Sequence, residues 1–160
     1  MLHINIICVG KLKEKYLQDA LAEYSKRLSK YCNLNIIELP DEKLPNNFND
    51  SLIKQIKSKE SNNILSHIEK GSYVLALDLK GKQYSSEEFS QKITNISLNS
   101  SSNITFVIGG TLGLDENVLK NSNELICFSK MTFPHQLIRI FLLEQIFRAF
   151  KISNNETYHR

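Results

Sequence analysis

The sequence predicts an α/β fold with a mostly parallel sheet and helices on both of its faces. Short apolar segments alternate about five times with helical segments along the 160 residues. The apolar segments are nearly continuous, which is typical of parallel strands covered on both faces. Because no repeat, low-complexity tail or composition break divides the chain, we expect one domain over residues 1–160.

The first half of the chain supplies two strands and two helices. We expect strands at residues 3–9 and 34–39, the second of which is stopped by Pro40. Residues 13–28 carry apolar side chains at helical spacing with charges on the other face, which predicts an amphipathic helix. After a polar loop, a second helix is expected at residues 51–69.

The second half repeats this alternation. A residue suited to a helix N-terminus precedes or opens each expected helix: Ser85 or Ser86, then Asp115, then Pro134. The strands are expected at residues 73–79, 104–108 and 125–128, with a turn at 80–82 and a last helix at 134–151.

Composition excludes several classes of protein. The longest apolar run is far below the ~20 residues needed to span a bilayer, and no basic segment precedes the apolar N-terminus. We therefore expect a cytoplasmic protein with no membrane association. The three cysteines form no CxxC pair, which favours buried thiols over disulfides or a zinc site: Cys8, Cys32 and Cys127.

Basic residues are concentrated at both ends of the chain. Residues 1–33 contain six basic and three acidic residues, and residues 130–160 contain five basic and two acidic ones. Two basic ends on a small domain suit a polyanionic partner, although an ordinary solvated surface explains them equally well.

Ligands in open α/β sheets bind at the carboxyl ends of the strands, and three such ends stand out at residues 77–81, 109–113 and 128–135. The second is a glycine-rich loop, which lets the backbone approach a ligand closely. It lacks the lysine of a P-loop and the position of a Rossmann fingerprint, so an ordinary tight turn is the alternative.

The segment 128–135 places backbone amides, a hydroxyl, a cation and an imidazole in one small space. Its His135 opens the last helix, where the helix dipole disfavours the imidazolium form. The alternative is a polar residue of the first turn with no chemical role.

The last helix is apolar almost all round, which predicts burial on more than one side. A terminal helix of a small domain has few internal partners, so we expect a second subunit, most simply through a two-fold interface. Arg139 and Arg148 on this helix are candidates to bind a phosphate or carboxylate, or to pair with Glu144.

The chain ends with Tyr158, His159 and Arg160. Tyrosine and histidine stack on bases and arginine binds phosphate, so this tail could reach a polyanion; simple fraying is the alternative.

Four segments carry a resemblance to a known family. They read VGKLKEKY from residue 9, FVIGGTLGL from residue 106, FSKMTFPHQLIRIFLLEQIFRAFKI from residue 128, and the terminal YHR. Together they resemble the bacterial large-subunit ribosomal RNA methyltransferase H family, a member of the SPOUT class, over essentially the whole chain. The chain departs from this pattern at residues 153–155 and at Thr111.

The resemblance implies a C-terminal deep trefoil knot and a homodimer with its site at the subunit interface. It implies S-adenosylmethionine as donor and, as substrate, N3 of a pseudouridine in the helix 69 loop of 23S rRNA on assembled ribosomes. Carried over residue by residue, the donor-binding positions are Leu77, Gly109, Phe128, Ser129, Lys130, Met131, Thr132 and Phe133.

Methyl transfer to N3 requires the N3 proton to leave, so a neutral base is needed. The candidates are His135 and the partner's His159, and no metal is expected. Arg148 and Arg160 could stabilise the developing negative charge, and Tyr158 could stack on the base. A non-catalytic RNA-binding module is the alternative function; a nucleotide-binding enzyme is disfavoured by the missing P-loop lysine.

Overall fold

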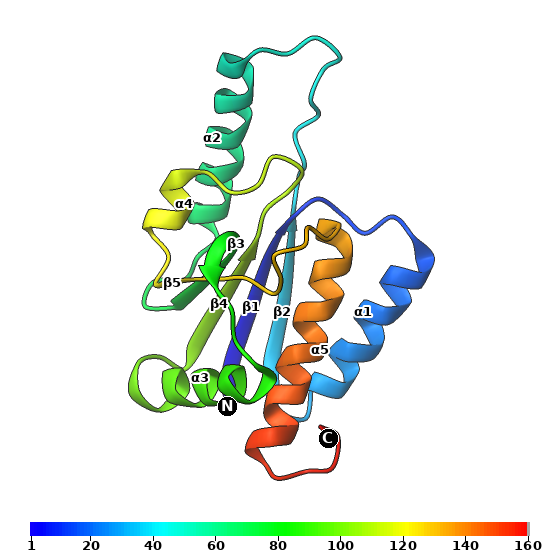
Figure 1. The fold of residues 1–160 in the computed structure, drawn as a ribbon, viewed down its shortest axis with the longest axis vertical. Helices are drawn as coiled ribbons and strands as arrows, with labels where there is room; N and C mark the ends of the chain where they lie inside the picture. The colour runs from blue at the N-terminus through cyan, green and yellow to red at the C-terminus, as the bar shows by residue number, and fades with distance from the viewer. Residues whose placement is uncertain (160) are drawn as a thin grey trace.

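The computed structural model describes residues 1–159 and builds one five-stranded sheet (Figure 1). The strands are β1 (Leu2–Val9), β2 (Cys32–Leu39), β3 (Tyr73–Lys82), β4 (Asn103–Ile108) and β5 (Glu124–Ile126). Their spatial order is β2-β1-β4-β3-β5, and all neighbouring pairs are parallel. The predicted parallel α/β architecture is confirmed, while the knot stays a prediction.

Helices cover both faces of the sheet. They are α1 (Lys15–Leu28), α2 (Asp50–Ser66), α3 (Ser86–Asn99), α4 (Glu116–Lys120) and α5 (His135–Ser153). Successive residues of a strand point to opposite faces of the sheet, so β1 contributes side chains to a hydrophobic core on each face. Its Ile6 packs in a cluster with residues of α1, α3 and α5, whereas its Ile7 packs with residues of α2 and α4.

The N-terminus of α3 shows how local sequence sets a helix boundary. Ser85, rather than Ser86, is the cap: its Oγ accepts from Glu88 N at 3.1 Å, and Glu88 Oε2 accepts from Ser85 N at 2.8 Å. Two backbone amides of the first turn are thereby satisfied. Asp115 likewise caps α4, and Pro134 is the residue immediately before α5.

The end of β3 differs from the sequence expectation. Residues 80–82 were expected to be a turn, yet β3 continues to Lys82. Ile126 of β5 pairs with both Leu77 and Lys82 of β3, because the β3 residues between these two do not pair with β5. β5 is correspondingly shorter than expected and ends at Ile126, after which the chain leaves the sheet.

Helix α5 packs against other elements of its own chain, so the expectation that it has few internal partners was wrong. Its apolar surface is therefore no argument for a second subunit. It packs between α1 and α3 and against the sheet (Figure 1). Leu142, Leu143 and Ile146 are fully buried there. Among the large apolar residues of α5, Phe141 is the prominent exposed one, at 41%. The homodimer itself remains a prediction that needs other support.

Arg139 is a structural residue rather than a surface phosphate ligand. Its side chain is buried, and its Nη1 donates to Glu38 Oε2 at 2.8 Å while its Nη2 donates to the Gly10 carbonyl at 3.1 Å. The same Glu38 oxygen accepts from Leu12 N at 3.1 Å. One guanidinium therefore joins α5, the end of β2 and the loop after β1.

The three cysteines are buried and free, as predicted. Burial raises the pKa of the Cys8 and Cys32 thiols to about 12, so neither forms a thiolate at neutral pH. None of the helices within residues 1–159 is long and apolar enough to cross a membrane.

Candidate functional site

A cleft of about 370 Å³ opens at the carboxyl edge of the sheet. Its walls come from the ends of β3 and β4, the segment after β5, and the first turn of α5. The three strand ends singled out in the sequence therefore meet in one place, where open α/β sheets bind ligands. The volume is in the range of small-molecule sites.

Seven of the eight expected donor-binding residues line this cleft together with His135. Those seven are Leu77, Gly109, Phe128, Ser129, Met131, Thr132 and Phe133. Lys130 is the exception, because it is exposed and does not line the cleft. The structure thus brings these residues together, and their binding role stays a prediction.

The glycine-rich loop after β4 is shaped by close backbone contacts. A side-chain carbon at Gly109 would lie 2.8 Å from the Gly113 carbonyl carbon. Gly113 N donates to the Gly110 carbonyl at 3.0 Å, and Gly113 has a φ of +76°, which favours glycine. The tight turn considered as the alternative is therefore present, and it forms one wall of the cleft.

Asp78 is a lining residue that the sequence reasoning missed. Its carboxylate, the only one among the described lining residues, accepts from Lys80 N at 3.0 Å. The signal was its position directly after Leu77, at the point where β3 begins to leave the ladder. In a mainly apolar cleft, a carboxylate favours a cationic or hydroxyl-bearing ligand. Within residues 1–159, no group of three or more His, Cys, Asp or Glu is placed to hold a metal ion.

His135 is the first residue of α5 and lines the cleft. It is half-buried and makes no hydrogen bond with any other residue between 1 and 159. Both ring nitrogens are therefore available to a ligand or substrate.

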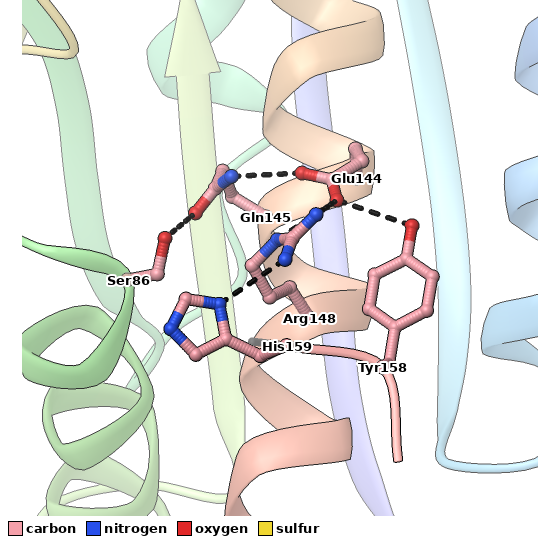
Figure 2. A network of polar contacts seen from close by, with 6 residues as sticks. All are labelled: Ser86, Glu144, Gln145, Arg148, Tyr158 and His159. Atoms are coloured by element: carbon pink, nitrogen blue, oxygen red, sulfur yellow. Dashed lines mark hydrogen bonds and ion pairs between the residues drawn. The ribbon is translucent and has the colours of Figure 1, made fainter.

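The tail lies at the other end of α5, within a network of polar contacts (Figure 2). Glu144 Oε1 accepts from Arg148 Nη2 at 2.6 Å and from Tyr158 Oη at 3.2 Å. The Tyr158 ring packs edge-on against Phe147, with the ring centroids 4.9 Å apart. Hydrogen bonding to Glu144 raises the pKa of Arg148, and burial raises the pKa of Tyr158. Arg148 thus pairs with Glu144, which was the alternative to binding a phosphate or carboxylate ligand.

His159 is bound on both ring nitrogens. Its Nδ1 lies 3.1 Å from Arg148 Nη1, and its Nε2 lies 2.6 Å from Glu87 Oε1. Arginine only donates, so Nδ1 accepts and Nε2 carries the proton toward Glu87. The hydrogen bond from His159 is also the main reason that the pKa of Glu87 is lowered. In this arrangement His159 has no free lone pair with which to act as a base.

The expected catalytic residues thus form two groups within one chain. His135 lies at the cleft, while Arg148 is 13 positions further along α5, or about 20 Å by helix rise. Tyr158 and His159 share the Arg148 end. Arg160 lies outside the described residues.

A second cavity of about 310 Å³ lies between the two groups. It shares Phe128 and Phe133 with the cleft, and its far wall includes Ser86 and Gln145 of the tail network. Ser86 Oγ donates to Gln145 Oε1 at 2.7 Å (Figure 2). The second cavity therefore adjoins the cleft on one side and the tail network on the other.

Comparisons with known proteins show which family the chain resembles. The family model described as "Predicted SPOUT methyltransferase" matches residues 2–159. The chain is 60% identical over 159 residues to ribosomal RNA large subunit methyltransferase H of Clostridium botulinum strain Eklund 17B, covering 99% of this chain and 100% of that one. It is 58% identical to the protein of the same name from Clostridium acetobutylicum, with the same coverage.

Solved structures resemble the chain in fold. A protein described as a "probable methylase family protein", from Haemophilus influenzae Rd KW20, matches with a TM-score of 0.56 at 13% identity, over 100% of this chain and 72% of that one. Another, described as a "putative methylase family protein", from Neisseria gonorrhoeae, matches with a TM-score of 0.51 at 12% identity, over 99% of this chain and 86% of that one.

Proposed function

Because the chain belongs to the SPOUT methyltransferases, and within them to the ribosomal RNA large subunit methyltransferase H family, we propose that it methylates N3 of a pseudouridine in 23S rRNA. The proposed target lies in the helix 69 loop of assembled ribosomes, and the proposed donor is S-adenosylmethionine. The enzyme acts as a cytoplasmic homodimer of single-domain chains. The observation that carries the proposal is the cleft at the carboxyl edge, because a pure RNA-binding module needs no small-molecule site.

The cleft residues fit the donor. The apolar walls at Leu77, Phe128 and Phe133 suit the adenine ring and the methionine chain, and Asp78 suits the ribose hydroxyls or the cationic sulfonium. Gly109 allows close approach of the backbone, since a side chain there would meet Gly113. When bound, S-adenosylmethionine supplies an electrophilic methyl group, so the protein mainly aligns the two reactants.

His135 is the proposed base. It would accept the N3 proton of pseudouridine, which leaves an electron pair on N3 to take the methyl group that bound S-adenosylmethionine would supply. Its position at the cleft and its free ring nitrogens support this role.

Replacing His135 by alanine is expected to lower single-turnover methylation by about 100-fold or more, the usual contribution of a general base. The affinity for S-adenosylmethionine, measured by calorimetry, should change little. His67→Ala is the control, because His67 is exposed at the end of α2, at the opposite edge of the sheet. Equal losses of rate and donor affinity would make His135 a structural residue.

The two groups of catalytic residues support the homodimer. Arg148, Tyr158 and His159 lie far from the cleft of their own chain, so we infer that they serve the cleft of a second copy. Exposed apolar side chains at the cleft also favour a partner, since Leu79 is 64% and Met131 is 73% exposed.

A mixed dimer tests this arrangement. One chain carries His135→Ala, the other lacks residues 158–160, and two different affinity tags isolate the heterodimer. Each parent homodimer should be inactive, and the heterodimer should recover about half of the wild-type rate, because a two-fold dimer then has one intact site of two. A heterodimer as inactive as its parents would show that the tail serves its own chain. Melting temperatures check that the loss of Tyr158 leaves the fold intact.

Mass mapping of 23S rRNA from a strain lacking the gene, with and without the gene restored, tests the substrate. The methyl group should disappear and return at one pseudouridine of helix 69. Calorimetry with S-adenosylmethionine separates the alternative, because a non-catalytic ribosome-binding module would bind ribosomes but not the donor.

A further inference from the structure

The segment that joins β1 to α1 and includes the first two residues of the helix, residues 10–16, lies beside the cleft. Its first residue, Gly10, follows β1, which is the parallel neighbour of β4. A side-chain carbon at Gly110 of the cleft would lie 3.0 Å from Val9 Cγ1, so the two strand ends are in direct contact. We call residues 10–16 the lysine loop; it flanks the glycine-rich wall of the cleft.

Contacts with α5 and with the end of β2 hold the lysine loop in place. Arg139, one turn along α5 from His135, donates to the Gly10 carbonyl at 3.1 Å and to Glu38, which in turn accepts from Leu12 N. Leu12 is 6% exposed and packs with Leu17 and Ile140. A fully buried arginine thus fixes the backbone of an exposed loop relative to the cleft.

Most of the exposed side chains of the lysine loop are basic or aromatic. Lys11 and Lys13 are exposed on either side of buried Leu12, and neither forms an ion pair with any residue from 1 to 159. Lys15 pairs with Asp19 at 3.1 Å, and Glu14 is the loop's single acidic residue. Tyr16 is 65% exposed, although a large aromatic ring is ordinarily covered.

We propose that the lysine loop binds RNA beside the target nucleotide, with Lys11 and Lys13 on backbone phosphates and Tyr16 stacked on an unpaired base. The proposal takes RNA as the substrate class from the proposed function. Lysines with an adjacent exposed aromatic ring suit single-stranded nucleic acid, which offers phosphates and free base faces together. Lysine contacts phosphate as a point charge, so this surface fixes the position of the RNA rather than reading its sequence.

Binding to purified ribosomes at several salt concentrations tests the proposal. The double variant Lys11→Gln, Lys13→Gln should bind about 10-fold more weakly at moderate salt, and the slope of log affinity against log salt should fall by about 1 to 2. Tyr16→Ala should weaken binding about 10-fold with an unchanged slope, because stacking releases no counterions. Affinity for S-adenosylmethionine should stay at the wild-type value in both.

The control is Lys70→Gln with Lys120→Gln, which removes the same charge at the amino edge of the sheet, before β3 and β5. It should bind ribosomes like the wild type. If the loop and control variants behave alike, the lysine loop is an ordinary solvated surface and the inference is wrong. If the wild-type protein itself binds no ribosomes, the proposed function and this inference both fail. Melting temperatures show whether any variant has lost its fold.

Discussion

Alanine at position 109 is expected to raise the Kd for S-adenosylmethionine by about 100-fold, which corresponds to about 3 kcal/mol of binding free energy. A Cβ there would lie 2.8 Å from the Gly113 carbonyl carbon, 3.0 Å from its oxygen and 3.1 Å from Leu114 Cδ2. Two of these atoms belong to the backbone and cannot rotate away, so the turn itself must move. Since the turn is a wall of the cleft, its displacement changes the site directly.

Calorimetry measures this effect, and Gly71→Ala serves as the control. Gly71 has a φ of +83° but no atom within 4 Å of a new Cβ, and it lies far from the cleft, before β3. Alanine there should cost about 1 kcal/mol of folding free energy through backbone strain and leave the donor Kd unchanged. If Gly109→Ala binds the donor as tightly as Gly71→Ala does, the glycine-rich turn is not part of the donor site.

Gly81→Ala is expected to have the largest effect on stability, lowering the free energy of unfolding by about 3 kcal/mol or more. A Cβ at Gly81 would lie 2.5 to 2.7 Å from the backbone C, N and Cα of Ile126. Position 81 lies where β3 returns to Ile126, and Cys127 N donates to the Lys82 carbonyl at 3.0 Å just beyond it. No side-chain rotation relieves such a contact, so β3 and β5 must separate locally.

Thermal melting should show Gly81→Ala about 6 to 12 °C below the wild type, because 1 kcal/mol shifts the Tm of a domain this size by about 2 to 4 °C. Ile126 and Cys127 also line the cleft, so donor affinity should fall with stability. Gly71→Ala again provides the comparison. A Tm equal to that of Gly71→Ala would mean that the two strands relax at a cost of only about 1 kcal/mol, and the expectation for Gly81 would be wrong.

The local sequence pattern predicted which segments form strands and helices, but it could not predict which of these segments lie next to one another in the sheet. The nearly continuous apolar run of β1 and the capping serine of α3 are properties of adjacent residues. The placement of β4 between β1 and β3, and the return of β3 to Ile126, depend on contacts between distant segments. Periodicity carries no information about such contacts.

The candidate site likewise has features that the local sequence predicted and features that it could not predict. Strand ends predicted the location of the cleft, because parallel strands bring their carboxyl ends to one edge. Arg139 was a candidate either to bind a phosphate or carboxylate ligand or to pair with Glu144. Its actual partner, Glu38, lies 101 positions away and cannot be predicted from any local pattern. The separation of His135 from Arg148 follows from helix geometry and was readable from their spacing, although the docking of the tail on Glu144 was not.

Helix α5 sets the distance between the two groups of proposed catalytic residues. It begins at His135 and continues past Arg148, so its length sets the distance between the cleft and the tail. Inserting a single residue between these positions would move the tail by about 1.5 Å and rotate it by about 100° around the helix axis. Substitutions on the exposed side of α5 leave this spacing unchanged, whereas insertions and deletions alter both distance and direction at once. In the proposed dimer, the number of residues in α5 therefore matters independently of which residues they are.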